Sequence, residues 1–359
     1  MVNQAMKLIV GLIVFLFITG MGNYNMTKFD WLASESAPKN YPMKVIKGDF
    51  FFPDNGSLYI PNGKRVDGGW GVGVSTHIVG DDLKSLPDRL EITYFSYTED
   101  KFYSGEFSLP YERILKLFNE GYYSPTDEED ITYHYIIAGI APGGTVSVWL
   151  SGTDKSVEVF SGQAKEVDID WDEFTGEKLN ITRKEYIESA INEELSSEAK
   201  IKLLQNGVPV ERWSKYHKSR FHWRLTLVEM KLRDNRTKRV YYFNGEEGYL
   251  EIASDAKLPK DSSSVPKSMS IVWNRTGYLK DDLIINMDFD EAEIFSAFEA
   301  IGRDDMAFEM EFRMEPEKNY DFTVWLQNEK DSIELKKTKI KTWKPGGMRY
   351  ENAGPKDTE

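Results

Sequence analysis

The chain has 359 residues, with 59 acidic against 45 basic side chains and a formal net charge of −14. A phosphate backbone is repelled by this charge, so nucleic acid is excluded as a general partner, whereas a basic protein surface is attracted. No cysteine is present, which excludes disulfides, thiolate metal sites and thiol catalysis. The length allows two domains, and the 9 Trp, 19 Tyr and 20 Phe suit half-buried β-sheets.

The N-terminal segment predicts export. Lys7 precedes an apolar run from Leu8 to Ile18, and small residues follow at Gly20 and Gly22. The run has the length of a signal-peptide core and is short for a membrane span. We therefore expect residues 1–22 to be a signal peptide. The alternative is an uncleaved anchor, in which case membrane contact is made only through residues 8–22. Either way the predicted location is periplasmic, soluble or tethered to the inner membrane.

The next segment predicts short strands and a glycine-rich loop. Asn55-Gly56 forms a turn between strands near 44–52 and 57–60, because Asn-Gly accepts positive φ. Gly68–Gly73 (GGWGVG) resembles a dinucleotide-binding fingerprint, but its third glycine would fall on Thr76. We interpret it as a bulged surface loop that presents Trp70 to a partner.

Residues 87–121 predict a hairpin followed by a helix. Leu90, Ile92 and Tyr94 alternate with polar residues as in a strand. A second strand follows, and Pro110 precedes apolar residues at helical spacing, among them Ile114 and Phe118.

Two acidic segments follow. Asp127, Glu128, Glu129 and Asp130 form a predicted loop before a hairpin of 131–140 and 146–150. Asp168, Asp170 and Asp172 alternate as calcium ligands do, but Glu173 and Leu179 stand where the required Gly and Glu belong. We predict no metal and no cofactor. Both segments remain candidates for contact with a basic protein.

Residues 182–204 carry the longest helical pattern, with Thr182 and Glu185 spaced as a capping box. Residues 266–301 then repeat the hairpin–helix pattern of 87–121, so that Pro87, Ile114 and Phe118 correspond to Pro266, Ile294 and Phe298. Strands ending in Val148-Trp149-Leu150 and Val324-Trp325-Leu326 follow the two units.

The repeat predicts an α+β protein of two similar domains, each an antiparallel, sandwich-like β-sheet with one packed helix. The predicted divisions are a signal segment at 1–22, a first repeat at 23–171, a helical linker at 172–207, a second, divergent repeat at 208–343 and a disordered tail at 344–359.

Catalytic patterns are incomplete. The four histidines, His77, His134, His217 and His222, lack the spacing of a helical zinc site. Gly73–His77 resembles a nucleophile elbow, but a histidine replaces the closing glycine. These patterns give no positive argument for an enzyme.

Several ordered segments resemble the bacterial family named domain of unknown function 2931. They are Ser34–Pro38, Pro87–Tyr97 and Ala138–Gly144 leading into Val148-Trp149-Leu150. The resemblance covers roughly residues 28–171, and the second repeat resembles the family more weakly. It implies an exported protein, since members are commonly taken to be lipoproteins. Some members look like immunity proteins encoded beside type VI secretion effectors of the phospholipase class.

The chain departs from the family where a lipobox would end in cysteine, because Met21 stands there, so lipidation is not expected. The leading hypothesis is a non-catalytic exported binding protein, with an immunity protein as its sharpest form. A cell-envelope structural component or an exported enzyme of unknown reaction is the alternative.

Overall fold

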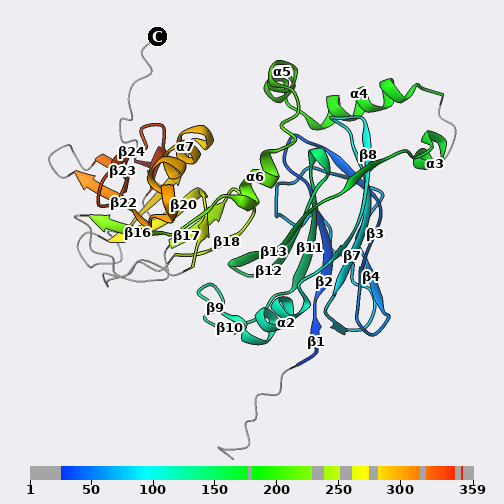
Figure 1. Cartoon of the computed structure of the whole chain (residues 1–359), viewed down its shortest axis with the longest axis horizontal. Coiled ribbons are helices and arrows are strands. Elements are labelled where there is room, and N and C mark those ends of the chain that lie inside the picture. Colours follow the sequence, from blue (N-terminus) through cyan, green and yellow to red (C-terminus); the bar gives the residue numbers. More distant parts are fainter. Residues whose placement is uncertain are drawn as a thin grey trace, which may run out of the picture.

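The computed structural model describes residues 26–176, 180–228, 238–250, 261–274, 282–315, 321–343 and 349–350. The described chain is mostly β-strand with a few short helices, so the coarse α+β prediction holds. Its earlier and later parts lie side by side (Figure 1). The predictions for 1–22 fall outside the described residues.

The first part contains two facing β-layers. One has the order β14-β8-β7-β3-β4, with β5 also paired to β3; the other begins β2-β11-β12-β13. The first layer comprises β3 (Met43–Phe51), β4 (Ser57–Tyr59), β5 (Arg65–Val66), β7 (Arg89–Ser96), β8 (Lys101–Ser108) and β14 (Lys165–Val167). The second comprises β2 (Leu32–Ser36), β11 (Tyr135–Ile140), β12 (Thr145–Gly152) and β13 (Lys155–Gln163).

One apolar core lies between these layers. Phe50 and Tyr94 from one layer meet Val148 from the other, and all three are fully buried. Helix α2 (Tyr111–Glu120) adds Ile114 and Phe118 to this core. The hairpin of β7 and β8 followed by α2 confirms the prediction for 87–121, because alternating and helical periodicities there are both strong.

The second part has its own core. The ten-stranded sheet continues as β18-β17-β20-β21-β25-β26, and a four-stranded sheet has the order β16-β22-β23-β24. The first set comprises β17 (Lys238–Tyr242), β18 (Glu247–Tyr249), β20 (Pro266–Asn274), β21 (Asp282–Asp288), β25 (Lys339–Trp343) and β26 (Arg349–Tyr350). The second comprises β16 (Trp223–Val228), β22 (Phe308–Glu315), β23 (Asp321–Gln327) and β24 (Ser332–Glu334). Helix α7 (Glu291–Ile301) packs Ile294 and Phe298 into this core.

Three two-stranded sheets complete the β-structure of the described residues. They pair β1 (Lys28–Asp30) with β6 (Leu83–Ser85), β9 (Tyr122–Ser124) with β10 (Glu129–Ile131), and β15 (Arg220–Phe221) with β19 (Ser263–Ser264). Single turns of 3-10 helix are η1 (Pro142–Gly144) and η4 (Arg303–Asp305).

Two details differ from the sequence prediction. Strands β2 and β11 pair in parallel, as do β16 and β22, so the sheets are mixed and not purely antiparallel. Long crossovers separate each parallel pair in the chain, and parallel pairing requires such connections. The predicted disordered tail contributes the short strand β26, which pairs with β25, and the rest of that tail lies outside the described residues.

The predicted linker is made of separate short helices: the end of α3 (Trp171–Thr175), then α4 (Arg183–Glu194) and α5 (Ser197–Asn206). The capping box of Thr182 with Glu185 is confirmed. Helix α4 ends at Glu194 because the next residue, Leu195, is extended and buried. Helix α5 then begins at a cap, in which the hydroxyl of Ser196 accepts a hydrogen bond from the Ala199 amide at 3.2 Å.

Helices α3 and α4 cover the outer face of β7 and β8. Phe174 and Ile187 from the helices pack with Phe95 and Phe102 from the strands and with Tyr97 from the turn between them. The short helix α6 (Arg212–Lys218) then connects to the second part. Thus α4 belongs to the first part by its packing.

Candidate functional site

Trp149 lies at the junction between the two parts. Its neighbours Val148 and Leu150 join the first core, so Trp149 projects from the opposite face of β12. It is nevertheless fully buried. Its Nε1 donates a hydrogen bond to the carbonyl of Asn244 at 3.1 Å, and the ring of Trp70 packs edge-on against it with the ring centroids 4.8 Å apart. The second part and the glycine-rich loop together cover this face.

The glycine-rich loop runs along the outer edge of β2. The amides of Gly69 and Val74 donate to the carbonyls of Ala37 and Glu35 at 2.9 and 3.0 Å. Trp70 is half-buried against Trp149, which differs from the exposed anchor that the sequence suggested. The exposed apolar side chains nearby are Val72, Val74 and Ile78.

Gly71 shows how closely the two parts approach. Its φ is +79°, and a Cβ at this position would lie 2.6 Å from the carbonyl oxygen of Gly245 in the β17–β18 turn. Only glycine accommodates both the positive φ and this contact. The glycines therefore serve packing between the two parts.

A polar cluster links α6 to both parts. Glu158 of β13 is 3% exposed, and its Oε2 accepts from Nδ1 of His217 at 2.9 Å and from Nδ2 of Asn244 at 3.0 Å. His217 belongs to α6 and Asn244 to the turn after β17. We call these three residues the junction cluster.

The segment Ala141–Gly144 supports the chain that leads into α6. The Gly143 amide donates to both carboxylate oxygens of Glu99 at 3.1 Å. A Cβ on Gly143 would lie 2.7 Å from Cβ of Val210, so Val210 rests directly on this turn. The ring of Tyr41 packs edge-on against that of Trp213 in α6, with the ring centroids 5.1 Å apart. Contacts from the first part thus fix the position of α6.

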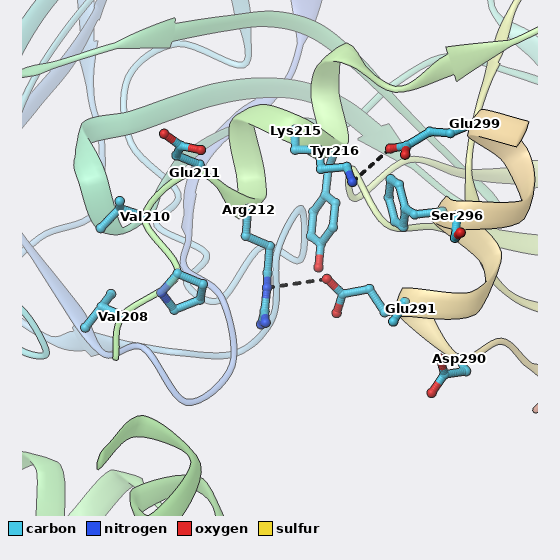
Figure 2. Close-up of a pocket in the computed structure, with 13 residues that line it drawn as sticks. Val208, Val210, Glu211, Arg212, Lys215, Tyr216, Asp290, Glu291, Ser296 and Glu299 are labelled. Atoms are coloured by element: carbon cyan, nitrogen blue, oxygen red, sulfur yellow. Dashed lines mark ion pairs between the residues drawn. The ribbon is translucent and has the colours of Figure 1, made fainter. Parts of the chain in front are cut away.

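Helices α6 and α7 enclose a groove of about 890 Å³ (Figure 2). Its wall on the α6 side includes Val208, Pro209 and Val210, and Tyr216 and Phe295 supply aromatic surface. The charged and polar lining residues are Glu211, Arg212, Lys215, Asp290, Glu291, Ser296 and Glu299, with Ala292 completing the lining. Four carboxylates stand against two cations, so the groove carries a negative charge.

Two ion pairs join the helices across this groove, as the dashed lines in Figure 2 show. Nε of Arg212 lies 3.4 Å from Glu291, and Nζ of Lys215 lies 2.9 Å from Glu299. All four side chains are between 38% and 53% exposed. Ion pairs at such exposure contribute only about 0–1 kcal/mol, so another cation can replace Arg212 or Lys215 at little cost.

Tyr216 points its hydroxyl toward Glu291 in this groove (Figure 2). Burial raises the pKa of the Tyr216 phenol, and the negative charge of Glu291 raises it further. The phenol therefore stays protonated at neutral pH and acts as a hydrogen-bond donor toward Glu291. The groove consequently combines anchored carboxylates with aromatic surface, which suits a cationic side chain with an apolar stem.

The two predicted acidic segments lie far apart. Asp127, Glu128, Glu129 and Asp130 are exposed at the β9–β10 hairpin, beside α2 in Figure 1. Asp168, Asp170 and Asp172 are exposed near α3, at the opposite end of the first part. Asp170 caps α3 by accepting from the Asp172 and Glu173 amides at 3.0 and 3.1 Å. The structure therefore does not combine these segments, or Trp70, into one surface.

The groove residues were not identified from the sequence. Glu291, Phe295 and Glu299 recur every four residues, a spacing that places them on one face of α7. Arg212 and Lys215 are likewise three apart on α6. These regular spacings are the sequence signal that points to the groove residues, but nothing in the sequence indicates that the two helices meet.

Among the described residues, no helix is both long and apolar enough to cross a membrane. No curated protein and no solved structure matches the chain significantly. One family model, described as "Protein of unknown function (DUF2931)", matches residues 19–211. That match extends beyond the resembling segments through α4 and α5 to Glu211 at the start of the groove. Since it spans more than half of the chain, the protein belongs to this DUF2931 family.

Proposed function

We propose that this protein is a non-catalytic exported binding protein, and that it acts as an immunity protein against a type VI secretion effector of the phospholipase class. The observation that carries the proposal is the acidic groove between α6 and α7. Its wall includes Val210, which is 41% exposed, and α5 nearby exposes Ile201 and Leu204. Apolar side chains bordered by carboxylates suit a basic protein surface.

Long-range charge supports the same partner. A net charge of −14 accelerates encounter with a basic protein, and the exposed segment 127–130 adds to the field without needing to touch the partner. Rapid capture matters for an immunity protein, because the effector must be blocked before it damages the envelope. Contact through Asp127–Asp130 or Asp168–Asp172, which the sequence suggested, is the alternative to contact through the groove.

Co-expression tests the function. An effector gene identified beside this gene is expressed with its product directed to the periplasm, with and without the chain, and growth is measured. We expect protection by the wild-type chain. Equal toxicity in both cultures would contradict the immunity function.

Three variants then locate the surface. One neutralises segment 127–130, one neutralises Asp168, Asp170 and Asp172, and one carries Glu291→Gln with Glu299→Gln. We expect only the groove variant to lose protection, with equal amounts of folded protein verified for each. Loss of protection on neutralising an acidic loop would move the contact to that loop.

Export is part of this proposal. We propose that residues 1–22 direct the chain across the cytoplasmic membrane, with cleavage after Gly22 or retention as an anchor. Mass spectrometry of the mature N-terminus distinguishes these outcomes. Cytosolic protein that retains residues 1–22 would contradict the periplasmic location.

We also propose that the two parts are copies of one domain. In support, the order β4-β3-β7-β8-β14 parallels β18-β17-β20-β21-β25, and β2-β11-β12-β13 parallels β16-β22-β23-β24. The first two strands of each four-stranded set run parallel. Trp149 and Trp325 occupy corresponding places between buried Val and Leu residues. An experimental structure in which 28–167 and 220–343 fail to superpose would contradict the duplication.

The alternative is an exported enzyme or an envelope component. A purified chain that turns over a phospholipid or peptidoglycan substrate would favour the enzyme, whereas stable retention in cell-wall fractions without an effector would favour the structural component.

A further inference from the structure

Helix α5 has no buried residue, although it is ten residues long. Its ends are capped within the chain: Ser196 binds the Ala199 amide at 3.2 Å, and the Gly207 amide donates to the Leu203 carbonyl at 2.9 Å. A helix of this length is marginal in water without tertiary packing. Its exposed apolar surface therefore needs an explanation beyond the fold of the chain.

The exposed apolar residues of α5, Ile201 and Leu204, lie on one face, whereas Ala199 and Leu203 are half-buried on another. Ile201 and Leu204 are three residues apart, which places them on neighbouring turns of the same side. They are 53% and 86% exposed, and such exposure of a leucine brings no stability to the isolated protein. Six residues beyond Leu204, Val210 is also exposed and lines the groove.

We call the exposed residues Ile201, Leu204 and Val210 the α5 face; Val210 lies in the connection from α5 to α6 and lines the acidic groove. Figure 1 shows α5 projecting at the top of the molecule, with the connecting segment leading down from it to α6. The carboxylate of Glu211 follows Val210 directly, and Glu291 stands across the groove. An apolar strip beside carboxylates is complementary to a helix that carries leucine-like residues on one side and lysine or arginine on the other.

The groove already holds cations of its own. Arg212 pairs with Glu291 and Lys215 pairs with Glu299, and both pairs are half-exposed. They show that these carboxylates accept a guanidinium and an ammonium group, and weak exposed pairs can exchange partners.

We infer that the α5 face and the adjoining groove bind a basic amphipathic helix of a protein partner. The apolar side of that helix covers Ile201, Leu204 and Val210, and its cations pair with Glu211 and Glu291. This inference rests on the proposed binding function and names the chemistry of the partner segment.

The test uses the full chain and two synthetic helical peptides with the same leucine face. One peptide carries lysine and arginine on its polar face, and the other carries glutamate. Titration calorimetry should detect binding of the basic peptide only. Hydrogen exchange of the amides in 197–206 should slow when the basic peptide is bound, because the partner supplies the packing that α5 lacks.

Leu204→Glu is the decisive variant. It adds a negative charge, which by itself strengthens attraction to a basic peptide, so weaker binding reports the lost apolar contact once circular dichroism shows that the variant keeps its helix content. We expect at least about tenfold weaker binding. Ile78→Glu is the matched control, since Ile78 is also 86% exposed but lies in the loop before β6. It should leave binding unchanged.

Several results would overturn the inference: equal binding of both peptides, unchanged binding by Leu204→Glu, or equal losses in both variants. Sedimentation of the chain alone provides a further check. A dimer that Leu204→Glu dissociates would assign the α5 face to a second copy and would also overturn it. Protection in the co-expression assay without dependence on Leu204 would leave the proposed function intact, whereas peptide binding without protection would contradict only the immunity function.

Discussion

Trp223 donates from its Nε1 to the backbone carbonyl of Ser264 at 3.2 Å, and Trp31 makes the same bond to Ser85 at the same distance. Ser264 stands two residues before Pro266, and Ser85 stands two residues before Pro87; each proline begins its hairpin–helix unit. Both tryptophans are buried. In both parts, therefore, a buried tryptophan near the start of the core donates to the backbone just before the hairpin–helix unit.

The unfolding free energy should fall by a similar amount in the two variants Trp31→Phe and Trp223→Phe. Each leaves a buried carbonyl without its donor and removes part of a buried ring, so we expect a loss of about 2–4 kcal/mol of unfolding free energy for each. Urea denaturation of the full chain measures it. Costs that differ by more than about 2 kcal/mol would count against equivalent roles.

Phe118→Ala and Phe298→Ala should each destabilise by about 3–5 kcal/mol, because both rings are at most 2% exposed and contact further aromatic rings. Tyr123→Ala is the control, since Tyr123 is 54% exposed and should change stability by less than about 0.5 kcal/mol. A loss under about 1 kcal/mol for either phenylalanine would show that its core position is wrong.

Glu35 should make stability depend on pH. Burial raises the pKa of its carboxyl above the ordinary 4.5, although the Ser75 hydroxyl donates to it and offsets part of the effect. An acid with a raised folded-state pKa contributes stability below its unfolded pKa and loses that contribution as pH rises through the folded pKa.

Glu35→Gln removes this titration while keeping an acceptor for Ser75. The difference in melting temperature, variant minus wild type, should therefore increase as the pH rises from about 4.5 to about 7. Calorimetry at both pH values measures the difference. A difference in melting temperature that decreases as the pH rises would contradict the raised pKa of Glu35.

The junction cluster should hold the two parts together. Glu158→Ala leaves the donors of His217 and Asn244 without their acceptor, and we expect a loss of about 1–3 kcal/mol. Tryptophan fluorescence should shift to the red as Trp149 becomes hydrated. Glu166→Ala, which removes an exposed partner of Lys101, should change neither property. An unchanged spectrum in Glu158→Ala would mean that the cluster does not control packing at Trp149.

Sequence periodicity was sufficient to predict the secondary structure where the stabilising contacts are local. The hairpins and helices at 87–121 and 266–301 follow directly from alternating and helical patterns, and the capping box at Thr182 has its signal within four residues. The break before Ser196 was missed, because helical propensity continues through it and only burial of Leu195 shows the interruption.

Long-range contacts could not be read in this way. Trp70 meets Trp149 through a loop that follows the edge of β2, and the Gly71–Gly245 contact joins positions far apart in the chain. Local composition suggested a surface loop because glycine-rich segments usually form one. The groove was hidden for a similar reason, since α6 and α7 are separated by several strands.

The central claim is that the chain captures a basic protein, and titration calorimetry with the purified effector that the immunity proposal requires tests it most directly. We predict a one-to-one complex whose affinity falls at least about tenfold between about 50 mM and about 300 mM NaCl, because salt screens attraction between opposite charges. The Glu291→Gln, Glu299→Gln variant should weaken the complex further. Absence of a complex at low salt, or affinity independent of both salt and these carboxylates, would contradict the account.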